Sequence, residues 1–215
     1  MVSAKFLRLA RLLQRPLGFA LWLLPFYAVP LYAENLRVVL EVSAPHQTFH
    51  NGKVAGITTS VVELLLQQAG LTPQYEVYPW ARAYRLAATT PNVLIYNIAR
   101  TPDREDKFEW IGKVASHRFG FLKLAARSDI QVQKLSDIHH YLVGAQREDF
   151  AAEWLQNQVQ QPPEFLELQA DLVETWRLLV NGKLDLMIDE VTGIDDMLLK
   201  FKLKPTDIEF VLFVP

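Results

Sequence analysis

The segment Asn92–Trp110, NVLIYNIARTPDREDKFEW, contains the pattern that decides the fold of this chain. It begins with an apolar run at residues 92–99 that lacks polar alternation, which is typical of a strand in a parallel sheet with helices on both faces. A turn rich in arginine, aspartate and glutamate follows at once, and Phe108 and Trp110 come after it. In open α/β sheets, ligand-contacting residues follow the carboxyl ends of the strands, so this segment predicts both a fold class and a site.

The rest of the chain alternates between strand and helix patterns. Apolar, β-branched runs predict strands, and apolar residues at helical spacing predict helices, two of which end at Gly70 and Gly182. We expect Asp149 to cap the helix that it begins. Before the segment, the expected elements are a strand at 36–42, a helix at 56–70, a strand at 73–80 and a helix at 81–90. After it, they are an extended stretch at 118–129, a strand at 141–145, a helix at 149–159, a strand at 164–169, a helix at 170–182 and a strand at 184–189.

This order predicts an α/β fold with two lobes that extended hinge segments join. In this interpretation, residues 34–123 form the first lobe and residues 124–210 form the second. The final apolar run, IEFVLFVP, would begin a return crossing to the first lobe at residues 211–215. Two lobes joined in this way create a cleft near the carboxyl ends of their strands.

Residues 1–33 have the pattern of a secretory signal peptide. Basic residues between Lys5 and Arg15 precede the apolar stretch LGFALWLLPFYAVPL, and Ala33 supplies a small residue for cleavage. The apolar stretch contains two prolines and is shorter than the about 20 residues of a membrane span. An uncleaved anchor is the alternative. In both cases we expect the rest of the chain to lie outside the cytoplasmic membrane, in the periplasm.

The chain after residue 33 is acidic. Residues 1–33 contain four of the 22 basic residues and no acidic residue, so the remainder has 18 basic and 24 acidic side chains, a net charge of −6. Such a charge offers no positive surface for nucleic acid, and we expect no nucleic-acid partner. The chain contains no cysteine, which excludes disulfides and a thiol nucleophile. We expect the protein to be a monomer, and we expect the packing of its side chains to stabilise it.

Polar residues follow the predicted strands of both lobes. Asn97, Thr101 and Arg104 come after the apolar run of the first lobe, and Asp189 and Glu190 follow LDLMI in the second. An arginine can hold a carboxylate through two parallel charge-assisted hydrogen bonds, and an aspartate can accept hydrogen bonds from an ammonium group. Together these side chains could bind a zwitterion, which carries both a carboxylate and an ammonium group.

Four parts of the sequence resemble the periplasmic solute-binding proteins of family 3, the amino-acid-binding class that serves ABC importers. They are the signal pattern, GITTSVVELLLQQAGL, YPWARAYRLAATTPNVLIYNIARTPDREDKFEWIGKV and LLVNGKLDLMIDE. The resemblance spans most of residues 36–195, and the Thr-x-x-Arg turn after the strand is its most specific part. It implies a type 2 periplasmic-binding fold. Against the family pattern, the chain lacks the usual C-terminal elements that complete the first lobe.

The resemblance also implies roles for individual residues. Arg104 falls where family members hold the ligand carboxylate, and Thr101 begins the same turn. Asn97 and Ala99 fall where polar side chains or backbone carbonyls line the pocket, and Asp189 falls where an acidic side chain receives the ligand ammonium. The loops APHQTFHNGK and VGAQREDF depart from the family pattern. These departures leave the identity of the ligand open.

Other residues in these segments have either a ligand role or a structural one. Trp80 and Arg82 of PWARA can stack on a ligand, or they can pack and carry surface charge, and we keep both as candidate ligand-binding residues. Arg100 and Glu105 can serve as the scaffold of the charged turn. Asp185 fits strand and loop structure better than a ligand role.

The function that the resemblance implies is the capture of a small polar ligand with a carboxylate group, similar to an amino acid, by hinge closure. The implied partner is the membrane permease of an ABC importer. A sensor whose closure signals to a receptor or kinase is the alternative. The chain contains no Gly-x-Ser-x-Gly, no His-Glu-x-x-His and no phosphate-binding glycine loop, so we expect no catalytic residue, no cofactor and no enzyme activity.

Five histidines raise the question of a metal site. His139 and His140 are adjacent, and in a strand they would point to opposite faces, where they could not share an ion. The other histidines lack the spacing of common metal motifs. We therefore expect no metal site among the histidines, which are His46, His50, His117, His139 and His140.

Overall fold

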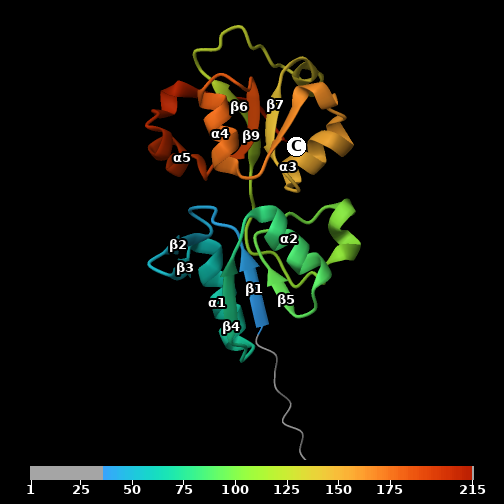
Figure 1. Cartoon of the computed structure of the whole chain (residues 1–215), viewed down its shortest axis with the longest axis vertical. Helices are drawn as coiled ribbons and strands as arrows, with labels where there is room; N and C mark the ends of the chain where they lie inside the picture. The colour runs from blue at the N-terminus through green and yellow to red at the C-terminus, as the bar shows by residue number, and fades with distance from the viewer. Residues whose placement is uncertain (1–35, 215) are drawn as a thin grey trace, which may run out of the picture. The chain divides into compact units, whose positions relative to one another are not determined.

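The structure, a computed structural model, describes residues 36–214 of the chain (Figure 1). The predicted signal peptide at residues 1–33 lies outside the described residues. Within residues 36–214, no helix combines the length and apolar character needed to cross a membrane. The described residues belong to one compact unit, which contains two larger sheets and a short hairpin. We call the parts built on the two larger sheets the first and second lobes.

The first lobe is built on a parallel sheet of three strands in the order β4-β1-β5 (Figure 1). Its strands confirm the predicted alternation with helices. The elements are β1 (Leu36–Leu40), the hairpin of β2 (Thr48–His50) and β3 (Lys53–Ala55), α1 (Ile57–Gln68), β4 (Pro73–Val77), α2 (Trp80–Thr89), β5 (Val93–Ile95) and the 3-10 turn η1 (Pro102–Lys107).

The central strand of the first lobe is buried on both faces, as its apolar run predicts. Val38 and Leu40 of β1 pack in one core cluster with Val62 and Leu66 of α1. Val39 is equally buried and points to the opposite face, on which α2 contacts the strand. The carboxyl end of β1 is therefore held between two helices.

The second lobe is built on a sheet of five strands in the order β10-β6-β9-β7-β8. Strand β7 pairs in parallel with β8 and β9, whereas β6 pairs antiparallel with β9 and β10. Strand β6 contains residues 119–123, which the sequence analysis assigned to the first lobe, and β10 contains residues 211–213, which it assigned to the return crossing. Both strands lie in the sheet of the second lobe. The elements are β6 (Phe119–Leu124), β7 (Val143–Gln146), α3 (Phe150–Trp154), β8 (Leu166–Gln169), α4 (Leu172–Val180), β9 (Leu186–Glu190), α5 (Ile194–Phe201) and β10 (Ile208–Phe213).

Two hydrophobic cores cover the two faces of this sheet. Phe121 of β6 and Ile188 of β9 belong to the core that contains α3, while Leu122 and Met187 belong to the core that contains α4 and α5. Figure 1 shows α3 on one side of the sheet and α4 and α5 on the other. Neighbouring residues of a strand point to opposite faces, so unbroken apolar runs are the expected sequence of such strands.

Three local predictions differ from the structure. The strand expected at 92–99 pairs only at Val93–Ile95, because Asn97 has a left-handed backbone with φ of 61° that ends the extended run. The helix expected at 149–159 has Asp149 at its N-cap, but α3 ends at Trp154 and continues as a π-helical turn. The strand expected at 73–80 ends at Val77, and Trp80 begins α2.

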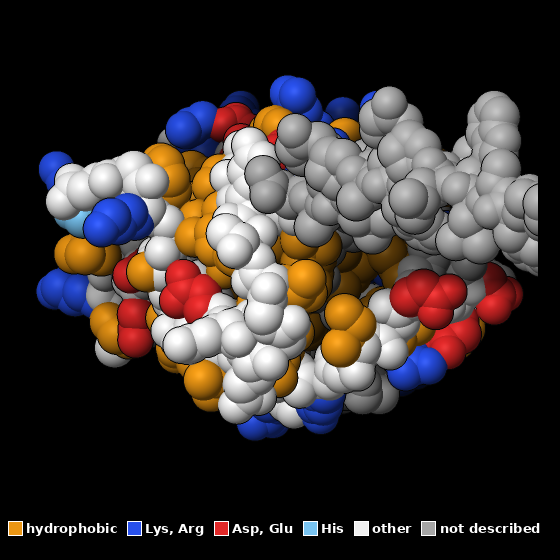
Figure 2. All heavy atoms as spheres, turned by 90° about the horizontal axis from the view of Figure 1, so that it is seen from below, with side chains coloured by type: hydrophobic (Ala, Val, Ile, Leu, Met, Phe, Trp, Pro, Cys, Tyr) orange, Lys and Arg blue, Asp and Glu red, His pale blue; other side chains and the backbone are white. Residues whose placement is uncertain are grey.

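Helix α1 presents part of its apolar surface outward. Ile57, Leu64 and Leu65 are 60%, 55% and 48% exposed, while Val62 and Leu66 are buried. Figure 2, which looks at the first lobe from below, shows hydrophobic side chains between charged ones on the molecular surface. The helix therefore contributes one face to the core and leaves a second apolar face open among the described residues.

Candidate functional site

Polar residues at the carboxyl ends of strands from both lobes form hydrogen bonds with one another. Glu41 directly follows β1, and its Oε1 accepts a hydrogen bond of 2.7 Å from Nε2 of Gln146, the last residue of β7. Glu190 ends β9, and its carboxylate lies 3.3 Å from Nε2 of His46, in the loop after β1. The candidate site lies between these strand ends, as expected for an open α/β sheet.

Arg104 also contacts residues of both lobes. Its side chain is 0% exposed, and its Nε donates to Oε2 of Glu153 at 2.8 Å. Nη2 donates to the backbone oxygen of Glu148 at 3.1 Å, and the guanidinium carbon lies 5.0 Å and 5.9 Å from the ring centres of Tyr84 and Trp80. Two of its nitrogens are thus bound to the second lobe, and aromatic rings of α2 line it.

Three buried polar atoms from the segment that follows β5 have no hydrogen-bond partner within residues 36–214. They are Nη1 of Arg104, Oγ1 of Thr101 and Oδ1 of Asn97. Nδ2 of Asn97 donates to Oε1 of Gln47 at 3.5 Å, and Ala99 lies half-buried in the same turn. A buried polar group without a partner costs about 1–3 kcal/mol. Three of the candidate residues in one short segment therefore each have a buried polar atom that makes no hydrogen bond to the described residues.

Trp80 connects the cationic and anionic parts of the site. Its indole nitrogen donates at 2.7 Å to the same backbone oxygen of Glu148 that Arg104 contacts. Its backbone nitrogen donates at 3.3 Å to Oε1 of Glu41. Burial raises the pKa of Glu41 to about 7, although the hydrogen bonds from Gln146 and Trp80 oppose the shift. Sequence analysis overlooked Glu41 because it placed this residue inside the strand expected at 36–42, whereas β1 ends at Leu40.

Asp189 is buried in the second lobe and pairs within it. Its Oδ2 accepts a hydrogen bond of 2.6 Å from the indole nitrogen of Trp176, and its Oδ1 accepts one from the backbone nitrogen of Glu190 at 2.7 Å. Burial raises the pKa of Asp189 to about 7, and the hydrogen bond from Trp176 opposes this rise. The hydrogen bonds of Asp189 thus connect it with α4 and β9. In the first lobe, Arg104 contacts Trp80 and Thr101, while Asn97 contacts Gln47.

The remaining residues of these segments have structural contacts. The guanidinium of Arg82 lies over the ring of Tyr78 at 4.2 Å. Arg100 forms an exposed ion pair with Glu105 in the charged turn, which agrees with a scaffold role. Asp185 accepts hydrogen bonds from Arg127 and from the backbone nitrogen of Leu142, as expected of a residue that joins strand and loop.

Two histidines and a glutamate from three distant segments form a second polar cluster. Nδ1 of His117 lies 3.0 Å from Oε1 of Glu190, and Nε2 of His46 lies 3.3 Å from the same carboxylate. One ligand atom from each of the three residues lies within 4.8 Å of the others. His46 and Glu190 are separated by 144 residues in the chain, so motif spacing could not reveal this group. Among the described residues, this is the group of side chains that could hold a metal ion.

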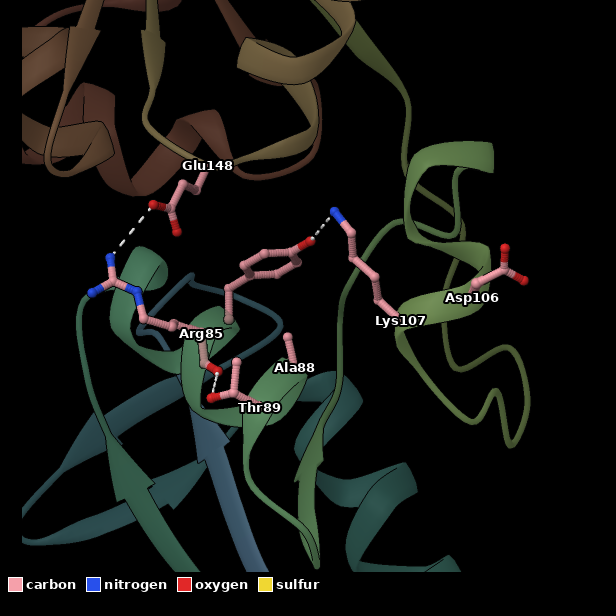
Figure 3. A pocket seen from close by; sticks show the side chains of 7 residues that line it. Arg85, Ala88, Thr89, Asp106, Lys107 and Glu148 are labelled. Carbon is pink, nitrogen blue, oxygen red and sulfur yellow. Dashed lines mark hydrogen bonds and ion pairs between the residues drawn. The ribbon is translucent and has the colours of Figure 1, made fainter.

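A hollow of about 490 Å³ lies beside the Arg104 site (Figure 3). Tyr84 and Glu148 line it and also contact Arg104, and Arg85 forms an ion pair of 3.5 Å with Glu148 across it. Nζ of Lys107 donates to the hydroxyl of Tyr84 at 3.5 Å on its other side. The hollow is lined by residues of both lobes, which are Tyr84, Arg85, Ala88, Thr89, Asp106, Lys107 and Glu148.

Comparison with known proteins identifies the fold. Neither the family models nor the curated protein sequences give a match to this chain. Among solved structures, the arginine-, lysine-, histidine-binding protein ArtJ from Geobacillus stearothermophilus matches with a TM-score of 0.70 at 14% identity, over 84% of this chain and 78% of that one. An ancestral arginine-binding protein bound to arginine matches with a TM-score of 0.69 at 13% identity, over 84% and 79% of the two chains.

A sensor domain is similar to the same extent. A histidine kinase sensor domain that resembles periplasmic binding proteins matches with a TM-score of 0.68 at 14% identity, over 84% of this chain and 77% of that one. The identities are low, but the matched shares cover both lobes of the described residues. This chain therefore has the two-lobed α/β fold of the type 2 periplasmic binding proteins.

Proposed function

We propose that this protein is an extracytoplasmic binding protein that captures a small amino-acid-like ligand between its lobes and delivers it to the permease of an ABC importer. The fold supports this proposal, because structures with it include arginine-binding and arginine-, lysine-, histidine-binding proteins. The predicted signal peptide supports a periplasmic location. Binding makes and breaks no covalent bond, so the proposal includes no enzyme activity and no cofactor.

The completely buried guanidinium of Arg104 is the observation that carries the proposal. Its Nη1 has no hydrogen-bond partner within residues 36–214, and neither does Oγ1 of Thr101 in the same turn. A ligand carboxylate that accepts hydrogen bonds from these two atoms would satisfy both at once. Hydrogen bonds to charged groups contribute about 1.5–3 kcal/mol each, more than neutral ones. We therefore assign Arg104 and Thr101 to the ligand carboxylate, with Asn97, Ala99 and Arg82 as further candidates around it.

Acidic side chains are available for a positive group on the ligand. Glu41 is joined to the Arg104 site through Trp80, and its carboxylate accepts hydrogen bonds from two neutral donors, the backbone nitrogen of Trp80 and the side chain of Gln146. A ligand ammonium or guanidinium near this carboxylate would offset the burial that raises its pKa. Asp189, the acidic residue predicted from the sequence, has the same raised pKa from burial. We propose Glu41 first and Asp189 second as acceptors for the positive end of the ligand.

Hinge closure is the mechanism that the hydrogen bonds between the lobes support. Glu148 and Glu153, which follow β7, both bind Arg104, and Gln146 binds Glu41. Residues 111–118 link the lobes in the chain, between η1 and β6. Opening of the lobes would break these bonds and expose Arg104 to water. Closure would restore them and exclude water from the bound ligand.

A sensory function is the second candidate, and the match to a histidine kinase sensor domain favours it. Transport and sensing use the same closed lobes and differ in the partner that recognises them. Uptake of the labelled ligand by cells that lack this protein distinguishes the two. Loss of uptake supports transport, whereas unchanged uptake with loss of a transcriptional response supports sensing.

Ligand screening tests the proposed binding function directly. We expect an amino acid to raise the melting temperature of residues 34–215, with arginine, lysine, histidine and glutamine as the first compounds in the screen. A ligand at 100 times its dissociation constant adds about 2.7 kcal/mol of stability, which is roughly 5–10 °C for a protein of this size. Isothermal titration calorimetry then gives the affinity. If neither amino acids nor other small carboxylates or amines shift the melting temperature, the proposed function is wrong.

A further inference from the structure

We propose that His46, His117 and Glu190 form a binding site for one divalent transition-metal ion of the zinc class, which joins the first lobe to the second. Two imidazoles and a carboxylate are the three protein ligands of many zinc sites, which keep a fourth position for water or another ligand. Ligand atoms of all three side chains lie within 4.8 Å of one another. The inference is independent of the amino-acid function proposed above.

The distances suit a small metal ion. A tetrahedral zinc ion with bonds of about 2.0–2.1 Å holds neighbouring ligand atoms about 3.3 Å apart. Nδ1 of His117 lies 3.0 Å and Nε2 of His46 lies 3.3 Å from the carboxylate of Glu190. The two imidazole rings meet edge to face, with their centres 4.7 Å apart. Small movements of side chains would therefore complete a three-ligand site without rearrangement of the backbone.

The backbone around each ligand is fixed by hydrogen bonds. Ser43 and Gln47 form two backbone hydrogen bonds of 2.8 Å that close the loop containing His46. The carbonyl of His46 accepts hydrogen bonds from the backbone nitrogen and the hydroxyl of Thr58, at 3.1 Å and 2.8 Å. Gly56 allows this packing, because a Cβ at that position would lie 2.3 Å from the His46 carbonyl oxygen. A metal-binding side chain on a fixed loop loses little conformational freedom when it binds an ion.

The other two ligands are held by the sheet of the second lobe. Glu190 is the last residue of β9 and pairs with Phe119, the first residue of β6. His117 precedes that strand by two residues, and the backbone nitrogen of Val191 donates to the carbonyl of Arg118 at 2.9 Å. The hydroxyl of Thr192 donates to the Glu190 carboxylate. Such a bond from a neighbouring residue orients a ligating carboxylate in many metal sites.

Nε2 is the ring nitrogen of His46 that an ion would bind. The residue is buried, and Nε2 lies 3.3 Å from the carboxylate of Glu190. Without an ion, a proton on Nε2 lets the ring donate a hydrogen bond to this carboxylate. With an ion, Nε2 and the carboxylate both donate electron pairs to the metal, and the ring proton moves to Nδ1. The ion therefore replaces one hydrogen bond, and both atoms that it binds already face each other.

Metal titration of tag-free, chelator-treated residues 34–215 tests the site. We expect one equivalent of Zn²⁺ to bind by calorimetry and to raise the melting temperature. With Co²⁺ in place of zinc, the visible absorption should show four or five ligands that include nitrogen. His46→Gln and His117→Gln should each weaken binding at least 100-fold. Exposed histidines provide the matched controls, and His50→Gln and His140→Gln should change the affinity less than threefold.

Folding of the variants is checked separately, by circular dichroism and melting in the presence of chelator. If His46→Gln does not fold, His117→Gln decides, because the His117 side chain is partly exposed. The proposal is overturned if no saturable binding of Zn²⁺ or Co²⁺ occurs, or if folded His117→Gln binds either ion as tightly as the wild type. Equal weakening by His50→Gln or His140→Gln would also overturn it, since binding would then occur at surface histidines.

Discussion

Replacement of Arg104 by alanine is expected to weaken ligand binding at least 100-fold, while the protein stays folded. The guanidinium is the one group of the candidate site with both a full positive charge and complete burial among the described residues. Removal of the arginine takes away the hydrogen bond from Nη1 and the positive charge beside the carboxylate. A hydrogen bond to a charged group contributes about 1.5–3 kcal/mol, and a loss of about 2.7 kcal/mol corresponds to the 100-fold change. The measurement is calorimetric titration with the amino acid that gives the largest thermal shift in the wild type.

Arg100→Ala is the matched control for this experiment. Arg100 lies in the same charged segment, but it is exposed and pairs with Glu105. Its removal takes away one positive charge at the surface and should change the affinity less than threefold, because exposed ion pairs contribute little. Equal weakening by both variants would show that net charge governs binding. Unchanged affinity in a folded Arg104→Ala protein would exclude Arg104 as the carboxylate-binding residue.

Loss of the arginine also affects stability, and this effect must be separated from binding. Arg104→Ala leaves the carboxylate of Glu153 without its cationic partner, whereas the carbonyl of Glu148 keeps the hydrogen bond from Trp80. The double variant Arg104→Ala with Glu153→Ala removes the unpaired charge. If the single variant unfolds, the double variant gives the binding measurement. Circular dichroism of both proteins without ligand shows whether they are folded.

The stability of the wild type is expected to fall as the pH rises from about 4.5 to about 8, and Glu41→Gln should remove about 3 kcal/mol of this fall. Burial raises the pKa of Glu41 from 4.5 to about 7 in the folded state. The folded state therefore binds a proton that the unfolded state releases at lower pH, and each pKa unit corresponds to about 1.4 kcal/mol. The stabilisation of the folded state by protonated Glu41 is complete below the pKa that Glu41 has in the unfolded state. It is lost as the pH rises through the pKa that Glu41 has in the folded state.

Glutamine fits this position because one oxygen of Glu41 makes both hydrogen bonds. Oε1 accepts from the backbone nitrogen of Trp80 and from Nε2 of Gln146, and an amide oxygen accepts from both in the same way. The carboxylates of Asp149 and Asp171 add to the repulsion that a charged Glu41 meets. Urea unfolding at a series of pH values measures the free energy of unfolding for each protein. At pH 8 the variant should be the more stable one.

The control for this prediction is Glu164→Gln, a change of the same chemistry at an exposed position. It should leave the dependence of stability on pH unchanged, within about 0.5 kcal/mol. Other acidic groups of the wild type also titrate in this range. The quantity that tests the prediction is therefore the difference in the free energy of unfolding between the wild type and Glu41→Gln at each pH. A difference that stays constant from pH 4.5 to pH 8 would contradict the raised pKa of Glu41.

The strands and helices of this chain follow largely from local patterns. Short apolar runs, residues 38–40 in β1 and residues 186–188 in β9, predicted these two strands, since strands covered on both faces are rich in apolar residues. Gly70 and Gly182 marked the ends of α1 and α4 because both have the left-handed backbone that follows a helix. The end of β5 was set by the conformation of Asn97, which the apolar pattern of its neighbours did not reveal.

The sequence by itself determined the α/β class and the candidate residues of the turn after β5. Tertiary structure alone decided their partners. Arg104 and Glu153 lie 49 residues apart, and His46 and Glu190 lie 144 apart, so no local pattern connects them. Contacts of this kind depend on where each strand ends in space and on which helices cover it. Hydrophobic periodicity specifies that a residue is buried, whereas the polar group that it meets is specified by the packing of distant segments.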